Sequence, residues 1–163
     1  MPSQGWREQP GVAVVGAGYW GKNLVRNFHG IGALRAVCDQ TPGVLDRFRE
    51  ECPGVRLTPD PGDILADPQI GAVAIATPAN THGELARAAL LAGKDVFVEK
   101  PLALEVGDAQ DLVRIAEEGG RILMVGHLLH YHPAVRELFS FVRAGRIGRI
   151  QYIYSSRLNL GKF

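Results

Sequence analysis

Two groups of residues in this sequence have the types and spacing that chemistry on a small molecule needs. The first is the glycine-rich run Gly16-x-Gly18-x-x-Gly21, which directly follows the apolar residues 12–15. Gly16 permits a tight turn, Gly18 lets a pyrophosphate approach the backbone, and Gly21 allows a helix to pack closely on the strand. The N–H groups at the start of that helix attract phosphates. This pattern predicts a dinucleotide-binding turn, with Tyr19 and Trp20 also contacting the cofactor.

Asp39 follows the second apolar run, residues 34–38. An acidic side chain there can accept hydrogen bonds from both ribose hydroxyls of NAD, and it repels the 2′-phosphate of NADP. Gln40 and Thr41 provide no arginine immediately after it. The sequence therefore predicts NAD as the cofactor rather than NADP.

The second group consists of polar residues that follow the fourth and fifth apolar runs. Thr77 and Pro78 come after one run, and Glu99 and Lys100 come after the other. Ligands bind at the carboxyl ends of the strands in an open α/β sheet, so we expect Thr77 and Pro78 against the cofactor and Glu99 and Lys100 near the nicotinamide. A lysine can serve as an acid or base for a sugar hydroxyl if burial and neighbouring charge favour its neutral form. The alternative is an exposed lysine paired with Glu99.

Three histidines, His127, His130 and His132, lie close together after the sixth apolar run. Their spacing matches neither the HExxH motif nor a zinc-finger pattern, so we predict no metal site. Tyr131 and His132 are instead expected to face the substrate.

Short apolar runs alternate with segments of helical periodicity, which is typical of a doubly wound parallel sheet, the Rossmann type of α/β fold. The expected strands are residues 12–15, 34–38, 55–57, 72–76, 96–98 and 122–125. The expected helices are residues 20–29, 44–51, 63–66, 81–91, 106–118 and 133–143. Thr81 and Glu84 are spaced as a capping box for the fourth of these helices.

The sequence suggests three regions: a disordered tail over residues 1–10, a dinucleotide-binding domain over 11–130, and a connecting helix leading into a second α/β domain over 131–163. Residues 149–160 alternate in polarity and are rich in aromatic and β-branched side chains, which predicts a strand. No further segment follows for it to pair with, so we interpret it as the first strand of a substrate domain and the chain as truncated.

Composition narrows the class of protein. The 163 residues are 46% hydrophobic with a net charge of +1, which gives no reason to expect nucleic acid or a membrane as a partner. Cys38 and Cys52 have no metal-binding spacing, and the N-terminus has no apolar signal segment. These features are typical of a cytoplasmic protein.

Four motifs in order, GAGYWG, ATPANTH, EKPLA and GHLLHYHPAV, resemble the Gfo/Idh/MocA family of NAD(P)-dependent oxidoreductases. The resemblance implies a catalytic role for Lys100 and places His82 near the dinucleotide. It also implies a second domain that covers a sugar substrate, supplies a histidine to proton transfer and often forms the interface of a homo-oligomer. A chain without that domain is expected to bind NAD but to turn over poorly.

The segments YWGKNLVRNF and YIYSSRLNLGK are similar to the branch of this family that oxidises the 3-hydroxyl of UDP-N-acetyl-2-amino-2-deoxyglucuronate. By that resemblance Arg157 and Asn159 meet polar groups of the substrate, and an arginine fork suits a carboxylate or a phosphate. The alternative is that these two residues cap a strand end.

Three other functions remain open from the sequence. The chain could be a non-enzymatic dinucleotide-binding module or an inactive truncated product. It could belong to another sugar or inositol dehydrogenase of the same family. A methyltransferase that uses S-adenosylmethionine also has a glycine turn, but the EKP and ATPANTH motifs argue against it.

Overall fold

The computed structural model describes residues 11–41 and 43–156. The chain divides into two compact units, residues 1–126 and 127–163. The first unit contains the sheet, and the second contains the last helix. Each unit is described here by itself.

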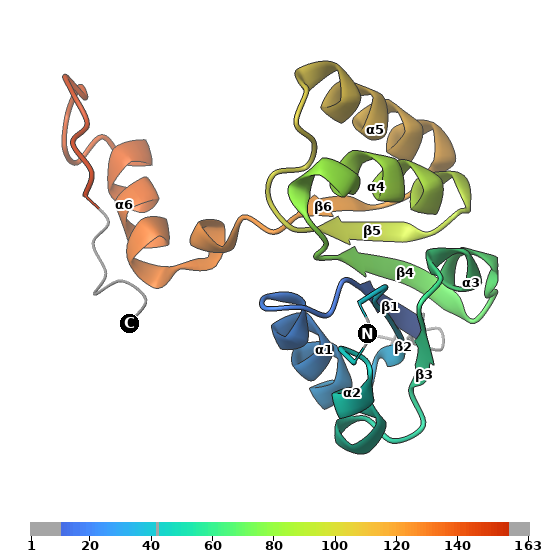
Figure 1. Ribbon diagram of the computed structural model, residues 1–163. Coiled ribbons are helices and arrows are strands. Elements are labelled where there is room, and N and C mark those ends of the chain that lie inside the picture. The colour runs from blue at the N-terminus through green and yellow to red at the C-terminus, as the bar shows by residue number, and fades with distance from the viewer. Residues whose placement is uncertain (1–10, 42, 157–163) are drawn as a thin grey trace, which may run out of the picture. The chain divides into compact units, whose positions relative to one another are not determined.

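A single six-stranded sheet forms the centre of the first unit, in the order β3-β2-β1-β4-β5-β6 (Figure 1). All neighbouring strands run parallel. The strands are β1 Gly11–Val15, β2 Leu34–Cys38, β3 Arg56–Thr58, β4 Ile70–Ile75, β5 Asp95–Val98 and β6 Leu123–Val125. The order reverses between β1 and β4, and open α/β sheets bind their ligands at the carboxyl edge beside such a reversal.

Helices cover both faces of this sheet. They are α1 Gly21–Gly30, α2 Asp46–Glu51, α3 Pro61–Ala66, α4 His82–Leu91 and α5 Val106–Gly119, with a 3-10 turn, η1 Ala79–Thr81, before α4. One buried cluster joins the sheet to α3, α4 and α5 through Ile64, Leu90 and Leu112. The other joins it to α1 and α2 through Val25 and Phe48. The predicted doubly wound α/β fold is confirmed.

The predicted capping box at the start of α4 is wrong. Thr81 has helical backbone angles, with φ of −103° and ψ of −8°, whereas a capping residue adopts an extended conformation. Its hydroxyl donates instead to the Thr77 hydroxyl at 2.7 Å or to the Pro78 carbonyl oxygen at 2.8 Å. The turn η1, which the sequence pattern did not reveal, directs the Thr81 side chain back toward the loop after β4.

The second unit contains the 3-10 turn η2, Leu128–Tyr131, and the helix α6, Pro133–Arg143, which begins at the predicted proline. The strand predicted over residues 149–160 is wrong for residues 149–156, where no strand forms, and residues 157–160 lie outside the described part. A strand needs a neighbour for its backbone hydrogen bonds, and the described residues 127–156 provide none. No helix within the described residues is long and apolar enough to cross a membrane.

Candidate dinucleotide site and catalytic lysine

The glycine turn between β1 and α1 is packed against the end of β4. Gly16 has a φ of +87°, and a Cβ there would lie 2.7 Å from the backbone of Ala76 and Thr77. A Cβ on Gly21 would lie 1.8 Å from the Gly16 carbonyl oxygen. A Cβ on Gly18, by contrast, would meet nothing within 4 Å. Gly16 and Gly21 therefore serve the fold, while Gly18 keeps an open surface above the turn, as a cradle for a pyrophosphate requires.

Asp39 shapes the same turn from the end of β2. Its Oδ2 accepts a hydrogen bond from the Ala17 N–H at 2.8 Å, and its Oδ1 accepts one from the Thr41 N–H at 2.8 Å. Each carboxylate oxygen has two lone-pair directions, so both can still accept a hydrogen bond from a ribose hydroxyl. The open cradle at Gly18 and the half-buried Asp39 carboxylate together fit the pyrophosphate and ribose of NAD.

Arg47 on α2 also contacts this turn, and the sequence analysis missed it. Its Nη2 donates to the carbonyl oxygen of Ala17. The two positions directly after Asp39 are Gln40 and Thr41, whereas the chain returns to the turn only at α2, after the intervening loop. A basic residue in the first turn of the helix after Asp39 is the sequence signal that could have revealed it.

Trp20 connects the glycine turn to the loop that follows β5. Its indole N–H donates to Oε1 of Glu99 at 2.5 Å. Glu99 is 7% exposed, and a Cβ on Gly126 would lie 3.1 Å from its carboxyl group. Tyr19 is exposed beside the turn, with the Lys22 ammonium 5.5 Å from its ring centroid. Two predicted cofactor residues, Trp20 and Glu99, thus bind each other.

His82 connects the loops that follow β4 and β5. It is buried, with Nδ1 2.7 Å from the Pro101 carbonyl oxygen and Nε2 2.9 Å from the Thr77 carbonyl oxygen. A neutral imidazole donates to one of these oxygens, and a doubly protonated ring donates to both. His82 therefore holds Thr77 in place, and Pro78 is exposed beside it. Contact of His82, Thr77 or Pro78 with the dinucleotide stays a prediction.

Lys100 is exposed at the carboxyl end of β5, next to the buried Glu99. Within the described residues it makes no hydrogen bond or ion pair, and Glu99 is bound to Trp20 instead. The Lys100–Pro101 peptide bond is cis. The lysine is accessible to a ligand at the carboxyl edge of the sheet, and residues 11–126 do not bury it.

Lys100 is also a predicted substrate residue and lies in the first unit, whereas the other predicted substrate residues lie in the second unit or beyond the described part. Tyr131 and His132 are exposed, and His132 directly precedes α6. The His130 ring stacks on Phe139 at 6.5 Å between centroids. Arg157 and Asn159 lie outside the described residues. Among residues 11–41 and 43–156, no group of three or more His, Cys, Asp or Glu side chains is arranged to hold a metal ion.

Known proteins resemble this chain in sequence and in fold. The chain is 35% identical over 144 residues to scyllo-inositol 2-dehydrogenase (NAD(+)) of Bacillus subtilis, covering 86% of this chain and 42% of the relative. It is 29% identical over 147 residues to UDP-N-acetylglucosamine 3-dehydrogenase of Acidithiobacillus ferrooxidans, covering 90% and 45%. The chain thus spans about two-fifths of the length of these relatives.

A solved structure adds a cofactor to this comparison. The crystal structure of scyllo-inositol dehydrogenase from Lactobacillus casei with bound NAD(H) and scyllo-inositol superposes with a TM-score of 0.78 at 26% identity. The superposition covers 86% of this chain and 43% of that one. The family model for the Gfo/Idh/MocA oxidoreductases, described as an NAD-binding Rossmann fold, matches residues 11–127. The match to that model and the geometry of the glycine turn agree on the family and its cofactor, so this chain belongs to the Gfo/Idh/MocA oxidoreductase family and carries its NAD-binding fold.

Proposed function

We propose that this chain is the cofactor-binding part of an NAD-dependent dehydrogenase that oxidises a secondary hydroxyl on a sugar or cyclitol ring. The observation that supports this most directly is the exposed Lys100 at the same sheet edge as the open Gly18 cradle and Asp39. A dehydrogenase needs these two capacities, for holding the dinucleotide and for moving the hydroxyl proton, side by side.

The residues of this site have separate roles in cofactor binding and proton transfer. Gly18 and the N-terminus of α1 receive the pyrophosphate, and Asp39 binds the adenosine ribose. The Trp20–Glu99 hydrogen bond and the His82 contacts hold the loops after β1, β4 and β5 in fixed positions relative to one another. Lys100 accepts the proton of the substrate hydroxyl at Nζ, and bound NAD supplies the hydride acceptor.

Two substrate classes fit this chemistry. The segments YWGKNLVRNF and YIYSSRLNLGK favour a UDP-sugar acid oxidised at its 3-hydroxyl, and a UDP-N-acetylglucosamine 3-dehydrogenase is among the relatives. The relative named scyllo-inositol 2-dehydrogenase favours an inositol instead. Both classes carry a secondary ring hydroxyl, and they differ in the charge of the ligand.

Substrate oxidation tests the proposal. NADH formation is measured with myo-inositol, scyllo-inositol, UDP-N-acetylglucosamine and UDP-N-acetyl-2-amino-2-deoxyglucuronate. Where a substrate is found, we expect Lys100→Met to lower kcat by about 100-fold or more, because general acid–base catalysis contributes that much, and to leave NAD affinity unchanged.

Lys100→Arg is the matched variant, because it keeps the positive charge and loses an amine that can be neutral. An equal loss in Lys100→Arg supports proton transfer, whereas full activity in Lys100→Arg contradicts it. Because a chain without the substrate domain is expected to turn over poorly, the assay is made on a protein that contains this chain together with such a domain. NAD binding by that protein without oxidation of any of the four compounds would point to a dinucleotide-binding module and contradict the proposed dehydrogenase.

A further inference from the structure

We propose that Trp20 is a positioning residue that links the dinucleotide site to Lys100: when its backbone N–H binds a phosphate, its indole group carries the change to Glu99 and so to the lysine. This role rests on the proposed function, in which Lys100 accepts the proton of the substrate. It adds that occupancy of the glycine turn sets the position of Lys100.

Trp20 has a donor on each side of this link. It immediately precedes α1, and its backbone N–H donates to no carbonyl oxygen among the described residues. An unpaired N–H at the start of a helix is available to a phosphate beside Gly18. The indole N–H of the same residue donates to Oε1 of Glu99 at 2.5 Å. One residue therefore contacts both the phosphate side and the lysine side.

The indole group reaches across a strand to contact Glu99. Trp20 follows β1 and Glu99 follows β5, and β4 lies between these two strands in the sheet. The contact thus joins the two halves of the sheet at the carboxyl edge, where open α/β sheets bind their ligands. Trp20 is 41% exposed and Glu99 is 7% exposed, so the bond runs from the open surface of the turn to the buried end of β5.

The carboxyl group of Glu99 depends on this contact. The indole N–H is the only hydrogen-bond donor to it among the described residues, and the Glu99 backbone N–H donates to the Ile75 carbonyl oxygen at 2.9 Å. A Cβ on Gly126 would lie 3.1 Å from the carboxyl carbon, so little space remains on that side. A buried acceptor without a donor is costly, so the Glu99 side chain moves when the indole group moves.

The neighbours of Lys100 fix its position, because its own side chain makes no hydrogen bond or ion pair among the described residues. On one side, the Pro101 carbonyl oxygen lies 2.7 Å from Nδ1 of His82. On the other side is Glu99, which Trp20 holds. The His82 contact does not involve the glycine turn, so the effect of a ligand at that turn reaches Lys100 through Trp20 and Glu99.

ADP tests this link, because it has the adenosine and pyrophosphate of NAD but no nicotinamide that could contact Lys100 directly. The backbone amide NMR signals of the full nitrogen-labelled chain are followed as ADP is added. We expect the Lys100 signal to shift and to saturate together with ADP binding measured by calorimetry. The Lys94 signal, at the opposite edge of the sheet, is the internal reference and is expected to stay in place.

Two variants remove the link from either end. Trp20→Phe keeps an aromatic ring and the backbone N–H but has no indole donor, and ADP is expected to bind it without shifting the Lys100 signal. Glu99→Met removes the acceptor and is expected to behave in the same way. Glu99→Gln is the matched variant, because its amide oxygen can still accept from the indole, and it is expected to keep the shift. Melting temperatures without ligand show that each variant is folded.

Four results would overturn the proposal. One is an ADP-saturated chain in which the Lys100 signal does not shift. Another is an equal shift in the unaltered chain, Trp20→Phe and Glu99→Met, which would mean that the effect takes another route. The third is loss of the shift in Glu99→Gln, which would mean that the hydrogen bond does not carry it. The fourth is loss of ADP binding in both Trp20→Phe and Glu99→Met, which would make the contact a support for the turn.

Failures of the proposed function are seen separately. Absence of both ADP and NAD binding by the unaltered chain would contradict the cofactor site itself and the link with it. Full activity of Lys100→Arg would contradict proton transfer by Lys100, whereas the ADP-induced shift of the Lys100 signal would still be observed.

Discussion

Single residues in the glycine turn have separable roles in stability and in binding. Gly21 fills a position where any side chain would collide with the Gly16 carbonyl oxygen, and Gly18 borders open space. The glycine motif is usually considered as one unit, but here one glycine belongs to the packing and another to the ligand surface.

Substitution of these two glycines by alanine separates the roles. Gly21→Ala is expected to lower the free energy of unfolding by more than about 2 kcal/mol, because backbone atoms must move to admit the methyl group. Gly18→Ala is expected to change it by less than about 0.5 kcal/mol. Denaturant titrations measure both, and equal destabilisation by the two substitutions would contradict this division.

The thiol of Cys38 provides a prediction about pH. Burial, followed by the nearby carboxylates of Asp39, Asp60 and Asp63, raises its pKa from 9.0 to about 12. In the unfolded chain the thiol has its ordinary pKa of 9.0. Between these values the unfolded chain releases a proton that the folded chain keeps, so the free energy of unfolding falls as pH rises. Below that interval Cys38 contributes no pH dependence.

Denaturant midpoints measured on both sides of pH 9.0 test this sign, with Cys38→Ala as the comparison because it has no thiol to ionise. The variant is expected to lose stability less steeply with rising pH than the unaltered chain. Identical slopes would mean that Cys38 does not titrate in this way.

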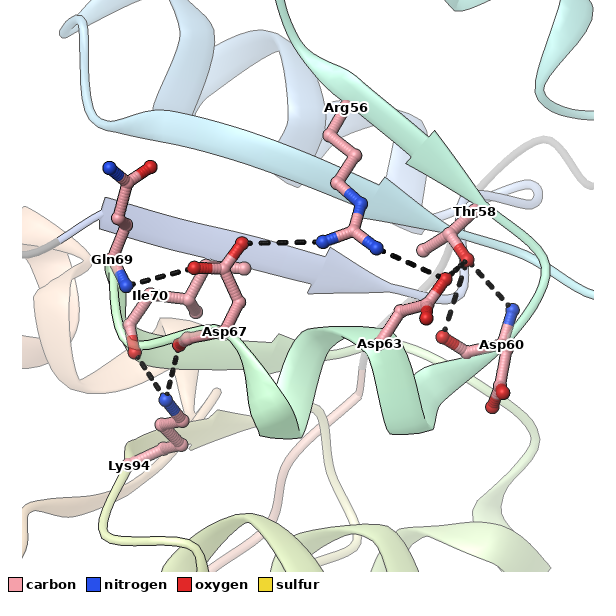
Figure 2. Close-up of polar contacts among 8 residues, drawn as sticks. All are labelled: Arg56, Thr58, Asp60, Asp63, Asp67, Gln69, Ile70 and Lys94. Atoms are coloured by element: carbon pink, nitrogen blue, oxygen red, sulfur yellow. Dashed lines mark hydrogen bonds and ion pairs between the residues drawn. The ribbon is translucent and has the colours of Figure 1, made fainter.

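At the scale of the elements, a polar network with one buried cation, Lys94, and one exposed cation, Arg56, fixes α3 to the sheet (Figure 2). Lys94, 6% exposed, donates to the carbonyl oxygens of Asp67 and Ile70, both at 2.7 Å. Arg56 on β3 forms ion pairs with Asp63 at 3.3 Å and with Asp67 at 3.4 Å. Lys94 joins the start of β5 to the start of β4. These strand ends lie at the edge of the sheet opposite the cofactor site.

The two cations are expected to differ in their effect on stability. Lys94→Met removes a charged donor from two carbonyl oxygens, of which that of Asp67 keeps the Ile70 N–H at 3.3 Å, and is expected to cost about 1–3 kcal/mol. Arg56→Gln removes exposed ion pairs and is expected to cost less than about 1 kcal/mol. Thermal unfolding measures both, with NAD affinity unchanged in each variant. A smaller loss for Lys94→Met than for Arg56→Gln would contradict the importance of burial here.

At the scale of the whole molecule, the sequence predicted the local elements of the fold but not the contacts between residues far apart in the chain. The strands and the glycine turn were predictable because alternating apolar runs and glycine spacing act over a few residues. The bond from Trp20 to Glu99 spans 79 positions, and the contact from Arg47 to Ala17 spans 30. No periodicity in the sequence encodes such pairs, so the partners of predicted site residues appeared only in the fold.

The failed strand prediction has the same cause. Residues 149–156 have the composition of a strand, and side-chain composition favours a strand only where a neighbour accepts its backbone hydrogen bonds. Tyr152 and Tyr154 are each more than four-fifths exposed within the described part of the second unit. The composition of residues 149–156 therefore allows a strand, but the segment does not form one within residues 127–156.

The central claim is that NAD binds at the glycine turn between β1 and α1, and one calorimetric titration tests it most directly. NAD is titrated into the unaltered chain and into Gly18→Ala, which is expected to fold with unchanged stability. We predict one bound NAD per chain, with an affinity that Gly18→Ala weakens by about tenfold or more, because the added methyl group occupies the approach of the pyrophosphate. Equal affinity in the two proteins, or no binding by the unaltered chain, would contradict the account.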